Sequence, residues 1–294
     1  MDRVRRGTPQ NCHRQDSALQ TPTRMKAVFT IQHHASTLEV ARWSPSLKTL
    51  PGPKILLLHE GLGCVAMWKD FGQQLADRLK VPVIAYSRAG YGASSPIELP
   101  RPLDYMQREA DQVLPDLLEE LCDGPRLLLG HSDGATIALA YAGSQRDPLL
   151  LGVIAIAPHV VVEDITIASI QQARAKFTTG SLAEKLARYH QSNLTTAFWG
   201  WNDVWLDPAF RTFSILDRLH AIDVPILALQ GTEDAYGTGT QLELIATSAA
   251  PTTITLVEGA NHSPHLTHTE QVLTAIERFL DKEGLLASVD TPST

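Results

Sequence analysis

The sequence predicts an α/β fold with a mostly parallel, eight-stranded sheet flanked by helices and a helical segment inserted into the second half of the chain. From residue 26 onward, short β-rich runs alternate with helical patterns, which is typical of parallel strands joined by covering helices. Several of these runs are continuously apolar, as strands buried on both faces must be. With 294 residues, of which 44% are hydrophobic, the chain is long enough to bury a large core.

Eight apolar or β-branched runs are expected to be strands. They lie at 27–32, 38–43, 54–59, 81–87, 126–130, 151–157, 225–230 and 252–258. Between the fourth and fifth runs, residues 104–121 place apolar side chains on one helical stripe, and Pro115 is expected to kink this helix. The last helix is expected to begin at a capping box formed by Thr267 and Glu270.

One stretch, 165–223, interrupts the alternation because it holds helical patterns and no good strand candidate. We interpret it as a helical cap inserted into a core formed by 26–164 and 224–282. Six aromatic residues gather in its second half: Phe198, Trp199, Trp201, Trp205, Phe210 and Phe213. These side chains either pack the cap onto the sheet or form the wall of an apolar pocket, and a cap over a site can do both. For the pocket we single out Trp199, Trp201 and Trp205.

The two ends of the chain are expected to be tails, at 1–25 and 283–294. The first 24 residues hold five Arg and two Asp without an apolar segment, so a secretory signal does not fit. This composition favours a disordered N-terminal tail, with an organellar transit peptide as the alternative. The C-terminal tail is expected to be flexible.

Composition and charge exclude several classes of function. The net charge of −7 gives no cationic surface of the kind that nucleic acids require. No apolar run approaches the roughly 20 residues that cross a bilayer, so we expect no membrane partner. Three cysteines without a CxxC spacing indicate neither a disulfide framework nor a zinc ribbon, and a reducing, cytoplasmic location is expected. The oligomeric state is left open.

The strongest motif is the pentapeptide Gly130-His131-Ser132-Asp133-Gly134, which follows an apolar strand and precedes a helical segment. In a G-x-S-x-G elbow, the sharp strand-to-helix turn lifts the serine hydroxyl clear of the sheet, and the glycines avoid collisions with neighbouring backbone. We therefore predict that Ser132 is a nucleophile. The N–H of Asp133 then points from a helix N-terminus toward a developing oxyanion.

A serine nucleophile needs a histidine base and an acid that orients it, in the chain order Ser, Asp or Glu, His. Asp234 follows the strand expected at 225–230, where a carboxylate is presented at the carboxyl edge of the sheet, and Glu233 is its nearest competitor. His262 lies in a loop between the final strand and the final helix, at the same edge. We predict Asp234 as the acid and His262 as the base.

Two further features bear on the chemistry of this edge. His265 and His268 continue a three-residue spacing from His262, which raises a metal site as an alternative, but Pro264 argues against a helix carrying all three and no H-E-x-x-H motif is present. We expect neither a metal ion nor an organic cofactor. The loop His59-Glu60-Gly61-Leu62-Gly63 is expected to supply the second oxyanion donor, the N–H of Gly61.

With these motifs, the chain resembles the α/β-hydrolase superfamily over about residues 26–282, in its cap-bearing branch of small esterases and related hydrolases. Beside the elbow, residues 87–94 resemble the family's D-x-R-G-x-G-x-S loop, and residues 259–265 resemble its G-x-G-H-x-P-H loop. Two departures are visible: Ser87 replaces the Asp of the first loop, and Glu60 replaces the first Gly of an H-G-x-G loop. The resemblance implies an α/β-hydrolase fold and carries the nucleophile, acid and base onto the residues predicted above.

The nucleophile favours hydrolysis of a small carboxylic ester or thioester through an acyl-enzyme, because relatives that act on haloalkanes or epoxides use Asp at the elbow. Carbon–carbon bond hydrolysis and perhydrolase activity use the same triad in relatives and stay open. A non-catalytic ligand receptor and a metal-dependent hydrolase are more remote alternatives. His262 must be neutral to accept the Ser132 proton, so we expect activity to be lost on the acid side of neutrality.

Overall fold

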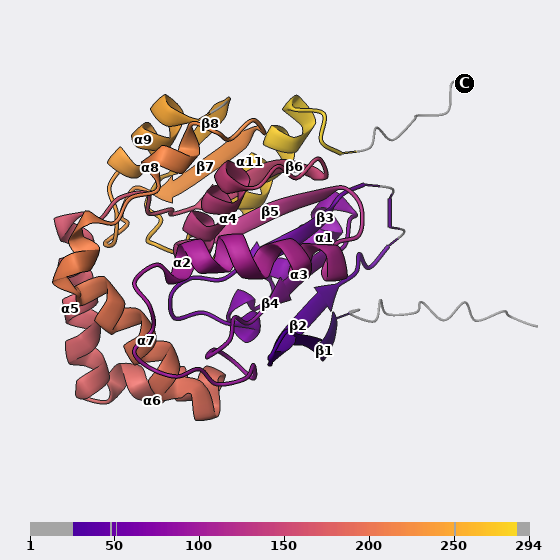
Figure 1. The fold of residues 1–294 in the computed structure, drawn as a ribbon. Coiled ribbons are helices and arrows are strands. Elements are labelled where there is room, and N and C mark those ends of the chain that lie inside the picture. The colour runs from indigo at the N-terminus through magenta and orange to yellow at the C-terminus, as the bar shows by residue number, and fades with distance from the viewer. Residues whose placement is uncertain (1–25, 48, 51, 250, 287–294) are drawn as a thin grey trace, which may run out of the picture.

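The computed structural model of this chain describes residues 26–286 except 48, 51 and 250. Its elements form one eight-stranded sheet with helices on both faces, which confirms the predicted fold class (Figure 1). The tail predicted at 1–25 lies outside the described residues, as does the C-terminal tail from residue 287 onward. The C-terminal tail was predicted from residue 283, and Leu285 and Leu286, which are described, pack against the core.

Each predicted strand corresponds to one strand of the sheet. The strands are β1 (Lys26–His33), β2 (Ser36–Trp43), β3 (Lys54–Leu58), β4 (Val83–Tyr86), β5 (Arg126–His131), β6 (Leu150–Ile156), β7 (Ile226–Gly231) and β8 (Thr252–Val257). Their order in space is β1-β2-β4-β3-β5-β6-β7-β8. The pairs β1–β2 and β2–β4 are antiparallel, and the pairs from β4 through β8 are parallel. The carboxyl ends of β3, β5, β7 and β8 therefore meet at one edge.

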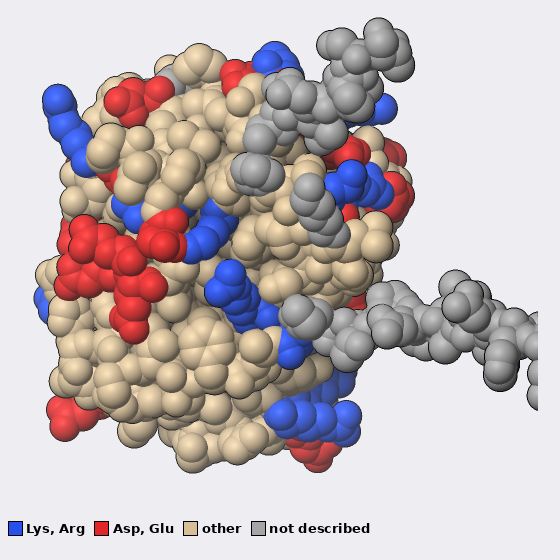
Figure 2. All heavy atoms as spheres, turned by 90° about the vertical axis from the view of Figure 1, so that its right-hand side faces the viewer, with Lys and Arg blue, Asp and Glu red and all other residues tan. Residues whose placement is uncertain are grey.

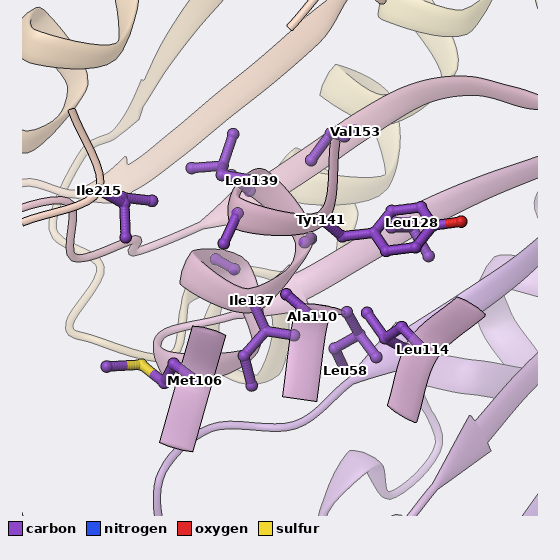
Figure 3. Close-up of a cluster of buried hydrophobic side chains, with 14 of the residues drawn as sticks. Leu58, Met106, Ala110, Leu114, Leu128, Ile137, Leu139, Tyr141, Val153 and Ile215 are labelled. Carbon is purple, nitrogen blue, oxygen red and sulfur yellow. The ribbon is translucent and has the colours of Figure 1, made fainter. Parts of the chain in front are cut away.

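Two apolar layers enclose the sheet. On one face lie α1 (Phe71–Leu79) and α11 (Thr269–Lys282), whose buried side chains pack against alternate residues of the central strands. The other face is covered by α2 (Tyr105–Arg108), α3 (Leu114–Leu121), α4 (Asp133–Ser144) and α9 (Thr240–Ser248). Helix α4 is buried along nearly its whole length, and in Figure 3 its Ile137 lies beside Met106 and Ala110. This packing fixes the helix that begins at the predicted nucleophile.

The predicted helix at 104–121 is divided by a π-helical turn, η2 (Glu109–Val113), between α2 and α3. Pro115 stands in the first turn of α3 rather than in a helix interior. Because proline has no N–H to donate and its ring crowds the carbonyl four residues back, a wider turn before it relieves both conflicts. The α-helix predicted over 104–121 is thus interrupted by a π turn just before Pro115.

The predicted capping box of the last helix was wrong. Helix α11 begins after His268 without a side-chain cap, and it is preceded by the short helix α10 (Pro264–Thr267). Thr267 is already helical and hydrogen-bonds the Ser263 carbonyl at 3.3 Å, so it lacks the extended backbone of an N-cap. Glu270 instead receives hydrogen bonds from Arg78 at 2.6 and 2.7 Å.

Helices α5 (Asp164–Thr178), α6 (Ser181–His190), α7 (Leu194–Leu206) and α8 (Leu216–Leu219) lie between β6 and β7 in the chain. The 3-10 turns η3 (Gln191–Asn193) and η4 (Pro208–Thr212) flank α7, and η1 (Val65–Trp68) precedes α1. In Figure 1, α5, α6 and α7 stand together to one side of the sheet. We call α5 through α7 the helical insertion.

Among the described residues, no helix is both long and apolar enough to cross a membrane. The face seen in Figure 2, which is the right-hand side of Figure 1, carries acidic and basic side chains between wide areas of other residues.

Candidate active site

The elbow is a strained turn between β5 and α4. Ser132 has φ 53° and ψ −118°, a conformation that residues with a side chain rarely adopt. A Cβ atom on Gly134 would lie 1.9 Å from the Leu58 carbonyl oxygen, and one on Gly130 would lie 2.2 Å from the Gly134 oxygen. Glycine is therefore required on both sides of the turn, as the pentapeptide predicted.

The structure brings together the three side chains predicted as nucleophile, base and acid. Ser132 Oγ lies 3.0 Å from His262 Nε2, and His262 Nδ1 lies 2.9 Å from both carboxylate oxygens of Asp234. Ser132 follows β5, Asp234 follows β7 and His262 follows β8, so three parallel strands of one sheet present all three at the same edge. This arrangement lets a proton pass from the hydroxyl to an imidazole whose other nitrogen faces a carboxylate.

Asp234 is held in place from three sides. Besides His262, the N–H of Tyr236 donates to it at 2.8 Å and the Gln230 amide donates at 3.2 Å. Burial acts to raise the pKa of Asp234, but its hydrogen bond to His262 and the charge of that ring lower it below the ordinary value. The competing Glu233 is exposed. Of the two carboxylates, Asp234 is the one in contact with His262.

The ring of His262 sits among other aromatic rings. Its centroid lies 4.7 Å from that of Tyr236, 5.1 Å from that of His131 and 5.7 Å from that of His159. His131 Nε2 is also 2.8 Å from the His262 carbonyl oxygen, which ties the loop to the elbow. Burial, followed by the charge of His262, lowers the pKa of His159 to about 3. His159 therefore adds a neutral wall beside the predicted base.

The loop after β3 is held in place by hydrogen bonds that two of its carbonyl groups accept. Arg88 donates to the His59 oxygen at 2.6 Å and to the Glu60 oxygen at 2.9 Å. A Cβ on Gly61 would lie 2.2 Å from the Trp201 ring, so glycine is needed where this loop meets the insertion. Glu60 has no left-handed φ, which explains why this position accepts a residue other than glycine.

The other departure from the family pattern also has a local partner. The Ser87 hydroxyl donates to Glu39 at 2.6 Å and accepts the N–H of Val65 at 2.9 Å. Ser87 thus joins β2 to Val65, which follows the loop after β3.

A cavity of about 380 Å³ lies over Ser132, between the sheet edge and the insertion. The core contributes the reactive side chains and most of the polar ones, and the insertion contributes mainly apolar side chains. The lining residues are Glu60, Gly61, Leu62, Met67, His131, Ser132, Asp133, His159, Thr166, Ile170, Leu182, Leu186, Trp201, Trp205, Ala235, Tyr236, Asn261, His262 and Ser263. Trp201 and Trp205 thus lie at the cavity, whereas Trp199 packs beside Phe177 and Phe198 outside this lining.

Sequence reasoning missed a buried polar network beside the elbow. The Tyr105 hydroxyl makes a hydrogen bond to Asp133 Oδ2 and receives one from Trp205 Nε1 at 3.2 Å. Burial raises the pKa of Asp133, against the opposing charge of Arg88. The sequence predicts a role for the backbone N–H of Asp133 and none for its side chain. Positions 105, 133 and 205 come from three different helices, and no pattern in the sequence joins them.

The histidines of the metal alternative do not converge. His265 is buried against Trp68 and Phe71, with ring centroids 5.2 Å away in both cases. Burial lowers its pKa well below the ordinary value. His268 hydrogen-bonds Thr267 at 3.0 Å. In the part of the chain that the structure describes, no group of three or more His, Cys, Asp or Glu is arranged to hold a metal ion.

Comparison with known proteins places this geometry in a broader setting. A model of the family described as "Alpha/beta hydrolase family" matches residues 55–275. Over 103 residues, the chain is 30% identical to protein phosphatase methylesterase 1 from Homo sapiens, covering 34% of this chain and 26% of that protein. The chain thus matches about a quarter of the length of this relative.

Solved structures share the fold at low identity. A proline iminopeptidase from Mycobacterium smegmatis has a TM-score of 0.68 at 18% identity, covering 88% of this chain and 99% of that one. A thermophilic esterase from Thermogutta terrifontis has a TM-score of 0.64 at 23% identity, covering 87% of this chain and 99% of that one. At these identities the likeness extends to the fold.

Proposed function

The chain belongs to the alpha/beta hydrolase family, and from this premise we propose that it is a serine hydrolase that cleaves a small carboxylic ester or thioester. The observation that carries the proposal is the continuous contact from Ser132 Oγ through the His262 ring to Asp234, with distances of 3.0 and 2.9 Å. The hydroxyl stands at a strained elbow and opens into a cavity, which is where a nucleophile needs to be.

The first half of the reaction forms an acyl-enzyme. His262 Nε2 takes the Ser132 proton as Oγ attacks the carbonyl carbon of the substrate. Asp234 holds the ring in the required tautomer and stabilises the imidazolium that forms. The N–H groups of Gly61 and Asp133 stabilise the oxyanion. His262 then returns the proton to the leaving oxygen or sulfur, and the bond to the leaving group breaks.

The second half releases the acid. Water enters the vacated leaving-group position and gives a proton to His262 while its oxygen attacks the acyl carbon. The second tetrahedral intermediate collapses with return of the proton to Ser132 Oγ. We assign the helical insertion as the cap of this site, because it supplies most of the apolar lining, including Ile170, Trp201 and Trp205. A small acyl or aryl group fits that surface.

Substitution of the nucleophile tests the proposal. Ser132→Ala is expected to lower kcat/KM for p-nitrophenyl and thioester substrates by at least about 10³-fold, because loss of a triad nucleophile removes the covalent route. It should also abolish labelling by a fluorophosphonate. Ser144→Ala, remote from the cavity, serves as the control and should label like the unmodified protein.

Substrate screening separates esterase chemistry from its closest alternatives. Esters and thioesters of graded chain length are compared with a dienone acid and with peracid formation from acetate and hydrogen peroxide. We expect the highest kcat/KM with a short ester or thioester. A mutant at Ser132 that keeps more than a tenth of the activity, or a tenfold preference for the dienone acid, would contradict the proposal.

A further inference from the structure

A second cavity adjoins the one over Ser132. It has a volume of about 350 Å³, and it shares with the first cavity a boundary made of six residues: Glu60, Met67, His131, Leu182, Leu186 and Ser263. Because each of these six residues lines both cavities, the two cavities are neighbours. A substrate longer than the first cavity would extend into the second.

The second cavity differs from the first in charge. Its lining includes Lys69, which follows η1 in the core, and Lys185 and Arg188, which stand one turn apart on α6. These cationic groups thus approach the space from both the core and the insertion. Among the described residues, none of the three forms an ion pair with a carboxylate. In a chain of net charge −7, this is a local excess of positive charge.

The acidic residue at the boundary does not cancel this excess. Glu60 Oε2 lies 3.8 Å from His131 Nδ1, on the elbow. Burial acts to raise the pKa of Glu60, but its interaction with His131 lowers it below the ordinary value. The carboxylate is therefore ionised and faces His131, and the three cations outnumber it in the lining of the second cavity.

The second cavity lies on the side of the site where His262 stands. Ser263, His265 and Leu266, which follow His262 in the chain, line the second cavity. In the proposed mechanism His262 returns its proton to the leaving group, so that group lies on the histidine side of the serine. The part of the first cavity that does not border the second is lined by apolar side chains of the insertion, Ile170, Trp201 and Trp205.

We propose that the second cavity binds an anionic group, a carboxylate or a phosphate, carried by the leaving group of the substrate. Lys69, Lys185 and Arg188 bind the anion, while a neutral acyl group occupies the apolar end beside Trp201. Carboxylate and phosphate both accept hydrogen bonds from ammonium and guanidinium groups. This inference rests on the proposed function and narrows it to one substrate class.

A matched set of butyrate esters tests the proposal. The leaving groups are 4-methylphenol, 4-hydroxyphenylacetate and 4-hydroxybenzylphosphonate, in which a methylene group insulates the charge from the phenol oxygen. A fourth ester, 4-methylphenyl hemisuccinate, carries the anion on the acyl side. At low ionic strength we expect kcat/KM to be at least about tenfold higher for one or both esters with an anionic leaving group, and added salt to reduce this advantage.

Charge-reversal variants test which residues bind the anion. Lys185→Glu/Arg188→Glu is expected to remove the advantage while changing kcat/KM for the neutral ester less than about twofold. Lys176→Glu/Lys282→Glu makes the same change of net charge away from the cavity and should keep the advantage. Lys69→Asn is expected to give a partial loss, and Asn tolerates the left-handed backbone (φ 50°) of this position. Comparing the carboxylate and phosphonate esters shows which anion fits better.

A binding measurement makes the proposal independent of turnover. The free 4-hydroxyphenylacetate and 4-hydroxybenzylphosphonate are titrated into Ser132→Ala, with and without the double charge reversal, and the reversal should weaken binding of the preferred anion at least about tenfold. Unchanged binding and an unchanged ester ratio would refute the cationic site while the serine mechanism stands. A higher rate for the hemisuccinate would refute the assigned side. Equal rates for Ser132→Ala and the unmodified protein on every ester would refute the proposed function itself.

Discussion

Two neighbouring carboxylates differ in their surroundings, and this difference separates their expected roles. Asp234→Asn keeps the shape but removes the charge that faces His262, so we expect kcat to fall by about 10³ to 10⁴-fold. Glu233→Gln changes an exposed side chain and should leave kcat within about twofold. Steady-state kinetics of the two variants measure the contrast. A larger loss in Glu233→Gln would move the acid by one position.

The protonation state of the site predicts a simple pH dependence. Asp234, whose pKa is lowered by its hydrogen bond to His262 against the effect of burial, stays ionised across an assay range of about pH 5 to 9. His159, with a pKa lowered by burial to about 3, stays neutral over that range. In the proposed mechanism, a proton on His262 Nε2 removes the acceptor for the Ser132 proton.

We therefore expect log kcat/KM to fall toward acid with a slope of one. The measurement is a pH–rate profile on protein dialysed against EDTA, with circular dichroism at each pH to follow the fold. A slope of two would indicate that a second group must lose its proton. Recovery of activity only after addition of zinc or manganese would favour the metal-dependent alternative.

At the scale of secondary-structure elements, the insertion presents its aromatic residues in two directions. Trp201 and Trp205 line the cavity, whereas Trp199 packs beside Phe177 and Phe198. We expect Trp201→Ala or Trp205→Ala to shift the ratio of kcat/KM between short and long acyl chains at least about fivefold. Trp199→Ala is the matched control and should leave this ratio unchanged. Equal ratios in all three variants would mean that the tryptophans only support packing.

The junction between β5 and α4 makes a second prediction for an element. In Gly134→Ala the new methyl group would lie 1.9 Å from the Leu58 carbonyl oxygen, so backbone must move, and we expect the free energy of unfolding to fall by at least about 2 kcal/mol. Gly239→Ala at the start of α9 meets no atom within 4 Å and should change it by less than about 0.5 kcal/mol. Urea denaturation measures both values. Equal stability of the two variants would contradict the steric argument.

The elements differed in how well local sequence specified them. Continuous apolar runs located the central strands, because strands buried on both faces need apolar side chains on both. The largely exposed edge strands β1 and β8 were located from β-branched and alternating residues instead. The start of α11 was misplaced because Thr267 serves a preceding turn that local pattern did not show. At the site, the elbow and its two partners follow strand ends and could be located from sequence. The contacts of Asp133 with Tyr105 depend on how three helices pack, which no short motif encodes.

Considered as a whole, the molecule buries several histidines, and this predicts sensitivity to acid. Burial lowers the pKa of His59 and His265 well below the ordinary value, that of His159 to about 3, and that of His190 to a smaller extent. In the unfolded chain these rings take up protons below about pH 6.5. The folded chain excludes those protons, so its stability is complete above that pH and is lost as the pH falls toward the folded pKa values.

Each proton bound only by the unfolded chain lowers the free energy of unfolding by about 1.4 kcal/mol per pH unit. We expect urea midpoints to drop steeply between about pH 6.5 and 4.5. His265→Gln should make this dependence shallower, and His220→Gln, at an exposed position, should not. Midpoints that are constant over this interval would contradict the prediction.

The place where the insertion joins the sheet has an evolutionary consequence. Helices α5 to α7 lie between β6 and β7 in the chain, and Val161, before the insertion, pairs with Ser214, after it, in an isolated antiparallel bridge. An excursion whose two ends lie side by side can be lengthened, shortened or exchanged by recombination without shifting the register of any strand. Ser132, Asp234 and His262 all lie outside it. Evolutionary changes in the insertion can therefore alter which substrates the cavity admits, while the three proposed catalytic residues stay in place.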